Sequence, residues 1–175
     1  MSDAASQAAP AAARQSEILR PPGADAALVL ADGTVFWGRG AGAPGTAIGE
    51  VCFNTAITGY QEILTDPSYA GQIITFTFPH IGNVGTNAED IEAAVPALAG
   101  CVFANHITEP ANWRAMGHLD AWLKSHGLAA VTGIDTRRLT RRIQGGGFAN
   151  GAIIHTPGEE PDIAAAEAEA AAWPG

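Results

Sequence analysis

The distribution of apolar and polar residues predicts strands throughout the chain and helices only in its second half. Short apolar segments of about four to eight residues, bounded by glycine, proline or asparagine, are typical of strands. Such segments predict strands at residues 26–30, 34–37, 48–55, 72–78, 98–104, 128–134 and 151–154. The clearest is QIITFTF, because Ile, Thr and Phe suit a pleated sheet and Pro79 ends the segment.

Turn residues connect the first two predicted strands into an early β-hairpin. Asp32-Gly33 lies between them, and this dipeptide suits a type I′ turn, in which both central residues need a positive φ. Residues 38–45 (GRGAGAPG) are rich in glycine, so we expect a loop there.

Three helices are expected between and after the later strands, at about 116–126, 135–144 and 163–173. In the second of these, Asp135 is a suitable N-cap, and Leu139 and Ile143 lie four residues apart on one face. A hairpin followed by strand–helix–strand–helix–strand predicts an α/β domain with mixed parallel and antiparallel strands.

Composition and charge exclude several classes of protein. Of the 175 residues, 47% are hydrophobic and 15% charged, which allows a substantial core and excludes disorder throughout. Only residues 1–24, rich in Ala, Ser, Gln and Pro, predict a disordered tail. The formal charge of -9 argues against binding to nucleic acid or an anionic membrane. The sequence lacks a signal peptide pattern and a membrane-spanning apolar segment, so we expect a cytoplasmic protein.

The two cysteines, Cys52 and Cys101, are too few for a disulfide framework or a cysteine-based zinc site. Both lie inside predicted apolar strands, where nothing lowers the pKa of a thiol, so we expect core cysteines rather than nucleophiles. The five histidines form no H-x₃-H or HExxH pair, and no metal site is predicted.

Three segments carry most of the polar groups: residues 53–69, 78–87 and 135–142. The glycines of 78–87 (FPHIGNVGTN) either free backbone amides to hold an anion or supply the geometry of a tight loop. Ser68 lies in a turn sequence, where its hydroxyl either stabilises the turn or binds a polar ligand group. A hydrolytic triad of Ser68, His80 and Asp66 is disfavoured because the serine has no GxSxG motif around it.

The third segment concentrates positive charge. Four of the nine basic residues lie within six positions, on one broad face of the predicted helix: Arg137, Arg138, Arg141 and Arg142. This face is either solvated or a docking patch for an acidic partner, since arginine is enriched at interfaces.

Several long motifs together resemble one family. GEVCFNTAITGYQEILTDPSY and FPHIGNVGTN, followed by GIDTRRLTRRI and ANGAIIH, resemble the N-terminal module of the small (glutamine amidotransferase) chain of carbamoyl-phosphate synthase. The likeness runs from about residue 26 to residue 155. It implies that residues 25–156 form a swivelling β/β/α-type domain and that 157–175 form a helical linker toward an amidotransferase domain.

The resemblance also implies a function. In this family the small chain hydrolyses glutamine and passes ammonia to a large synthetase chain. That chain makes carbamoyl phosphate from bicarbonate, ammonia and two ATP, for arginine and pyrimidine biosynthesis. The N-terminal module docks to the large chain and contributes one serine to the glutamine site, which corresponds to Ser68. ATP and Mg are expected on the large subunit, and no cofactor is expected in this chain.

The sequence departs from the family at its end. It stops at Gly175, where the resemblance places the linker, and the amidotransferase module with its Cys–His–Glu triad does not follow. We therefore expect either a fragment or a catalytic module on another chain, and no glutaminase activity from this chain alone. The alternative function is a noncatalytic binding or scaffold domain with the same fold.

Overall fold

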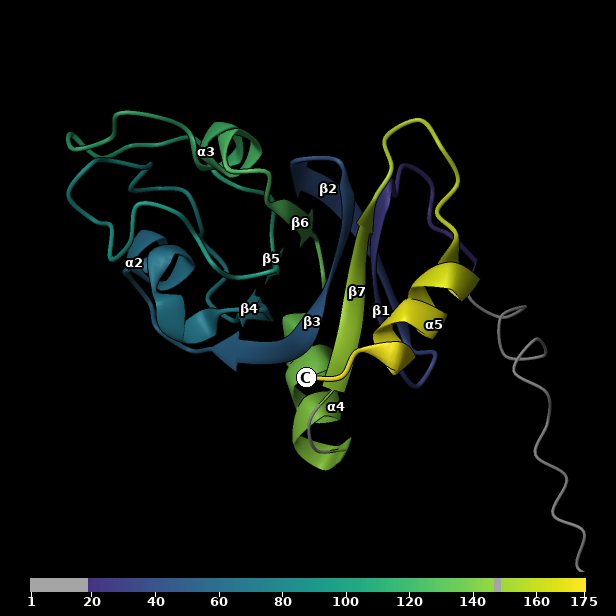
Figure 1. The fold of residues 1–175 in the computed structure, drawn as a ribbon. Coiled ribbons are helices and arrows are strands. Elements are labelled where there is room, and N and C mark those ends of the chain that lie inside the picture. The colour runs from purple at the N-terminus through teal and green to yellow at the C-terminus, as the bar shows by residue number, and fades with distance from the viewer. Residues whose placement is uncertain (1–18, 147–148) are drawn as a thin grey trace, which may run out of the picture.

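The computed structural model describes residues 19–146 and 149–175 (Figure 1). Most of the tail predicted to be disordered, residues 1–18, lies outside these residues. The last part of that segment lies close to the folded domain: Ala24 is buried, and the guanidinium of Arg20 donates to the Ala24 carbonyl oxygen at 2.6 Å.

Seven strands form a closed barrel. In the order of their pairing they are β1 (Ala26–Leu30), β2 (Val35–Gly42), β6 (Ala129–Thr132), β5 (Gly100–Phe103), β4 (Gln72–Phe76), β3 (Gly45–Asn54) and β7 (Ala149–His155), which returns to β1. Strands β3, β4, β5 and β6 pair in parallel, and the remaining pairs are antiparallel. The predicted mixed α/β class is confirmed.

The glycine-rich segment 38–45 is not the loop that the sequence predicted. β2 continues through it to Gly42, and β3 begins at Gly45. The glycines are needed for close approach: a Cβ at Gly38 would lie 2.3 Å from the Thr132 carbonyl oxygen, and one at Gly40 would lie 1.9 Å from Cδ2 of His155. Glycine here therefore lets other groups pack against a strand rather than breaking it.

The hairpin between β1 and β2 forms as predicted, with a different turn geometry. Gly33 has a φ of 81°, while Asp32 does not adopt a positive φ. Instead, the Asp32 carboxylate accepts a hydrogen bond from the Thr34 N–H at 2.9 Å. The side chain therefore stabilises the turn in place of a second left-handed residue.

The helices are α2 (Tyr60–Thr65), the 3₁₀ turn η1 (Pro67–Tyr69), α3 (Leu119–Ser125), α4 (Thr136–Gly146) and α5 (Ile163–Ala172). The sequence predicted α3, α4 and α5, and α4 extends slightly further than expected. It missed α2, which has only six residues and no side-chain cap, since its N-cap is Gly59. Among the described residues, no helix is long and apolar enough to cross a bilayer.

The core has an inner part and two outer parts. The barrel interior is filled by aliphatic side chains such as Leu28 and Ile153, and Leu139 of α4 packs into the same cluster. A second cluster lies outside β4, β5 and β6 beneath α2, α3 and the connecting segments. A third lies outside β1 and β7, where Ala166 and Ala170 of α5 are buried. Helix α5 and the α2–α3 side therefore lie on opposite sides of the barrel (Figure 1).

Candidate functional site

Ser68 lies in the 3₁₀ turn η1, directly after α2, and is exposed. The Asp66 carboxylate caps this turn by accepting a hydrogen bond from the Ser68 N–H at 2.8 Å. This bond, with a smaller contribution from the Ser68 side chain, lowers the pKa of the Asp66 carboxyl below its ordinary value. The turn is thus held largely through the backbone of Ser68, and its side chain is presented at the surface.

Three contacts hold the Ser68 turn and the residues after it against neighbouring parts of the chain. The Asn54 side-chain amide at the end of β3 donates to the Tyr69 hydroxyl at 3.2 Å. Gly71, with a φ of 71°, donates its N–H to the Ala97 carbonyl oxygen at 3.0 Å. The backbone at Gly71 also lies so close to β3 that a Cβ at Gly49 would be 2.2 Å from its carbonyl oxygen. The turn that carries Ser68 is therefore held mainly against β3.

The end of α5 lies beside the same turn. A methyl group at Gly71 would lie 3.9 Å from Cζ2 of the Trp173 indole. The Trp173 carbonyl oxygen in turn accepts a hydrogen bond from the Asn150 side-chain amide at 3.1 Å. Trp173 and Gly71, which follows the Ser68 turn by two residues, are therefore neighbours, which the sequence did not indicate.

The first two polar segments come together in the structure. The Tyr60 hydroxyl donates to the Gly85 carbonyl oxygen at 2.6 Å, and burial raises the pKa of Tyr60 to about 12. The Gln61 side chain makes two bonds to the Asn87 backbone: Nε2 donates to its carbonyl oxygen at 2.7 Å, and Oε1 accepts from its N–H at 2.9 Å. Sequence reasoning overlooked both anchors because α2 itself was not predicted.

The glycine loop 78–87 is a structural loop in this arrangement. Gly82 and Gly85 have φ values of 103° and 71°. The N–H of Gly85 donates to the Gly82 carbonyl oxygen, that of Thr86 to the Gly117 carbonyl oxygen, and that of Asn87 to Gln61. Because these amides already have partners, the structure favours a tight structural loop over a site where backbone amides bind an anion. His80 contacts the Phe78 ring at 5.9 Å between centroids, and among the described residues no hydrogen bond joins it to Ser68 or Asp66.

Both cysteines lie in strands, as predicted. Cys101 is completely buried, which raises the pKa of its thiol. Cys52 is partly buried, and burial together with the neighbouring Glu50 carboxylate raises its pKa to about 11. A thiol with such a pKa is almost entirely protonated at neutral pH and is a poor nucleophile. In the described part of the chain, no three His, Cys, Asp or Glu side chains cluster as metal ligands.

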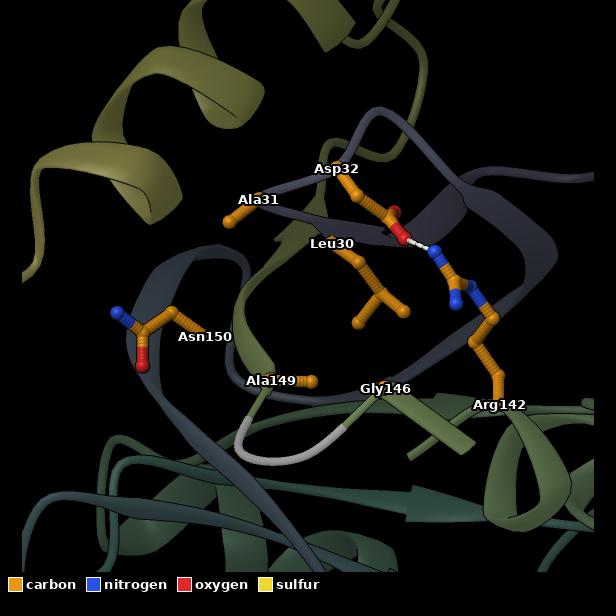
Figure 2. Close-up of a pocket in the computed structure, with 7 residues that line it drawn as sticks. All are labelled: Leu30, Ala31, Asp32, Arg142, Gly146, Ala149 and Asn150. Atoms are coloured by element: carbon orange, nitrogen blue, oxygen red, sulfur yellow. Dashed lines mark hydrogen bonds and ion pairs between the residues drawn. The ribbon is translucent and has the colours of Figure 1, made fainter. Parts of the chain in front are cut away.

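The structure divides the four arginines of α4 into two pairs. The Arg138 guanidinium lies 5.2 Å from the centroid of the Phe36 ring, and Arg142 forms an ion pair with Asp32. Figure 2 shows this ion pair between two of the residues that line a pocket, which Leu30 and Asn150 also line. Arg137 and Arg141 are exposed on the same helix. Two of the four exposed arginines therefore contact the β1–β2 hairpin.

The family model of the carbamoyl-phosphate synthase small chain, CPSase domain, matches residues 28–153, which include most of the barrel, η1 and α4. The chain belongs to this family. The matched range contains the motifs at residues 49–69, 78–87 and 133–143 and most of the one at 149–155, and the resemblance stated above is confirmed.

Curated relatives agree with this assignment. The carbamoyl phosphate synthase small chain of Mesorhizobium japonicum is 60% identical over 154 residues, which are 86% of this chain and 39% of the relative. That of Bradyrhizobium diazoefficiens is also 60% identical over 154 residues, with the same coverage. That of Caulobacter vibrioides is 54% identical over 158 residues, covering 88% of this chain and 41% of the relative. The chain thus spans about two fifths of the length of these relatives.

Proposed function

We propose that this chain is the N-terminal part of a glutamine-hydrolysing small subunit of carbamoyl-phosphate synthase, acting in the cytoplasm in arginine and pyrimidine biosynthesis. In this proposal it docks to the large synthetase subunit and completes the glutamine site with Ser68. The proposal is supported by the family match over residues 28–153, together with the 60% identity to a carbamoyl phosphate synthase small chain.

The position of Ser68 supports its part in the proposal. An exposed side chain on a turn that is held against β3 is suited to contact a ligand held mainly by another module. The longer relatives continue beyond the region matched here. A segment that follows Trp173 would begin beside Gly71, three residues from Ser68, so a following module would start close to the proposed site. ATP and Mg belong to the large subunit in this proposal.

Two finer features of the family are also proposals for this chain. The first is that the barrel moves as a swivelling β/β/α-type domain. The second is that Arg137 and Arg141 on α4 form a docking patch for an acidic partner, since the chain is otherwise strongly acidic. To test the second proposal, an Arg137→Glu/Arg141→Glu variant should bind the large chain more weakly in a pull-down. Unchanged affinity would mean that these two arginines are simply solvated.

The proposal is tested by restoring a complete small chain. The part of the Mesorhizobium japonicum relative that follows the matched region is joined after Gly175, and the product is mixed with the large synthetase chain. We expect carbamoyl phosphate synthesis with glutamine from the joined protein, and synthesis with ammonia alone from the large chain. A joined protein that is folded but never supports glutamine-dependent synthesis would favour a noncatalytic binding or scaffold domain instead.

A further inference from the structure

Asp66 lies at the junction between α2 and the 3₁₀ turn that carries Ser68. It is both the C-cap of α2 and the N-cap of η1, with an extended backbone. Its N–H donates to the Ile63 carbonyl oxygen at 3.4 Å, and its own carbonyl oxygen accepts from the Tyr69 N–H at 3.2 Å. Its carboxylate accepts from the Ser68 N–H at 2.8 Å. Asp66 therefore connects α2 directly to the backbone of the turn.

Helix α2 gives this junction a firm support. The Gln61 side chain bonds to the loop at 78–87 through both its amide oxygen and its amide nitrogen. Thr65, directly before Asp66, is buried. Its hydroxyl donates to the Gln61 carbonyl oxygen at 2.8 Å and accepts from the Glu92 N–H at 2.9 Å. The turn therefore starts from a residue whose position the fold determines.

The residues on either side of Ser68 restrict its backbone further. Pro67 is the first residue of η1, and its ring fixes the φ angle there. The Tyr69 hydroxyl accepts a hydrogen bond from the Asn54 side-chain amide of β3. If the Asp66 carboxylate were removed, Tyr69 would still hold the turn against β3. We therefore expect a substitution of Asp66 to loosen the placement of Ser68 without unfolding the domain.

The Asp66 carboxylate is committed to Ser68. Among the residues that the structure describes, no basic side chain forms an ion pair with it. The hydrogen bond from the Ser68 N–H is the main reason that the pKa of this carboxyl lies below its ordinary value. Hydrogen bonds to a charged acceptor are stronger than those between neutral groups. The principal interaction of this carboxylate within the described chain is therefore with the residue proposed to contact glutamine.

We propose that Asp66 is a positioning residue for glutamine binding, which acts by holding the Ser68 backbone so that the Ser68 hydroxyl is aimed at the substrate. This inference rests on the proposed function and adds to it the residue that orients the glutamine contact. A group that is held in place before the substrate arrives loses little conformational entropy on binding. Asp66 acts here through Ser68 and is not itself a contact to glutamine.

The test measures steady-state kinetics of the joined small chain, mixed with the large synthetase chain, at varied glutamine concentration. Asp66→Ala should raise the KM for glutamine by roughly threefold to tenfold, with kcat nearly unchanged. Asp66→Asn should recover most of this loss, because an amide oxygen also accepts the Ser68 N–H. Synthesis from ammonia should be the same for all variants, and thermal melting confirms that each variant is folded.

The matched control is Asn112→Ala. The Asn112 side-chain oxygen accepts the Arg114 N–H at 2.9 Å, which is the same bond to the second residue along the chain, in a different loop. Removal of this bond should change the glutamine KM by no more than about twofold. The comparison separates the loss of Ser68 placement from the general effect of losing such a bond in an exposed turn.

A double variant shows whether Asp66 acts through Ser68. Once the hydroxyl is absent, there is nothing left for Asp66 to aim. Asp66→Ala/Ser68→Ala should therefore have the same glutamine KM as Ser68→Ala, to within about twofold. A KM in the double variant that is the product of the two single effects would mean that Asp66 acts by a separate route, and would overturn the positioning role.

The remaining outcomes separate this inference from the proposed function. If the unaltered joined protein does not support glutamine-dependent synthesis, the proposed function itself is overturned. If Ser68→Ala raises the glutamine KM and Asp66→Ala does not, only the positioning role of Asp66 is overturned. The positioning role is also overturned if Asp66→Ala lowers the thermal midpoint while the glutamine KM is unchanged, since Asp66 then only stabilises the turn.

Discussion

The side-chain amide of Asn150, at the start of β7, donates to the carbonyl oxygen of Trp173 at 3.1 Å. This bond fixes the end of α5 against the barrel and places the Trp173 indole beside Gly71 and the Ser68 turn. The end of α5 and the segment that follows the Ser68 turn are thereby held close together by elements of this chain.

Ser68→Ala should raise the KM for glutamine in a small chain restored with its amidotransferase module. A hydrogen bond contributes about 0.5–1.5 kcal/mol when neutral and about 1.5–3 kcal/mol to a charged group. The expected rise in KM is therefore roughly threefold to a hundredfold. Synthesis from ammonia should stay near normal because ammonia bypasses the glutamine site. Ser125→Ala, an exposed serine on α3, is the matched control. A lower thermal midpoint with unchanged glutamine kinetics would make Ser68 a turn residue only.

The chain alone should not release ammonia from glutamine. Formation of a glutamyl thioester needs a thiolate, whereas burial raises the pKa of Cys101 and raises that of Cys52 to about 11. The measurement is ammonia release by the purified chain, with Cys52→Ser and Cys101→Ser as comparison variants. Turnover above background that either substitution removes would contradict the prediction.

Asp120 should stabilise the fold above about pH 4 and lose this effect in acid. Burial by itself raises the pKa of this carboxyl. Hydrogen bonds from Lys124 at 2.6 Å and from the Gly42 N–H at 2.7 Å outweigh burial and lower the pKa below its ordinary 3.8. Since the folded pKa lies below the unfolded one, the stabilisation is present above the unfolded pKa. It is lost as the pH falls through the folded pKa.

Asp120→Asn should accordingly lower the free energy of unfolding at pH 7 by about 1 kcal/mol. The loss is no larger because the carboxylate is only partly buried, and solvent weakens its interactions. The variant should also lose part of the decline in stability below about pH 4. Urea unfolding at several pH values measures both effects. Parallel pH profiles for the variant and the unaltered chain would contradict the assignment of this decline to Asp120.

Gly40→Ala should destabilise the barrel, because its Cβ would lie 1.9 Å from Cδ2 of the buried His155. Overpacking of this kind costs about 1–3 kcal/mol, and here the overlap is with a ring that cannot bend away. Gly145→Ala is the control: it lies in α4 with nothing within 4 Å of its Cβ. That change should be neutral or stabilise by up to about 1 kcal/mol, since alanine favours helix. Thermal unfolding distinguishes the two, and equal midpoints would contradict the argument.

Sequence reasoning predicted those elements whose signals are local. The strand at Gln72–Phe76 shows its β-forming residues directly, and α4 shows its Asp135 cap, which accepts the Arg138 N–H at 2.9 Å. The continuation of β2 through its glycines was not predicted, because the reason for those glycines is the approach of Thr132 and His155 from distant strands. Barrel closure likewise depends on pairing between segments far apart in the chain.

Of the candidate site, the sequence predicted the serine itself but not the residues that the fold brings near it. Ser68 was recognised through the motif around it, and the structure places it on an exposed turn. Its proximity to Trp173 was not predicted, because no local pattern connects a turn with the end of a helix that follows it by many residues. The ion pair between Arg114 and Asp90 was not predicted for the same reason, because the fold alone brings these two residues together.

The closed barrel has a consequence for synthesis on the ribosome. β7 is the last strand to be made, and it lies between β1 and β3, pairing with both. Until residues 149–155 emerge, the nascent chain has two open strand edges that are able to pair with neighbouring chains. The inner core cannot be sealed earlier by the first six strands, because Ile153 of β7 belongs to it. The barrel can therefore close during translation only after its final strand has emerged, and a pause before that point leaves the two open edges exposed for longer.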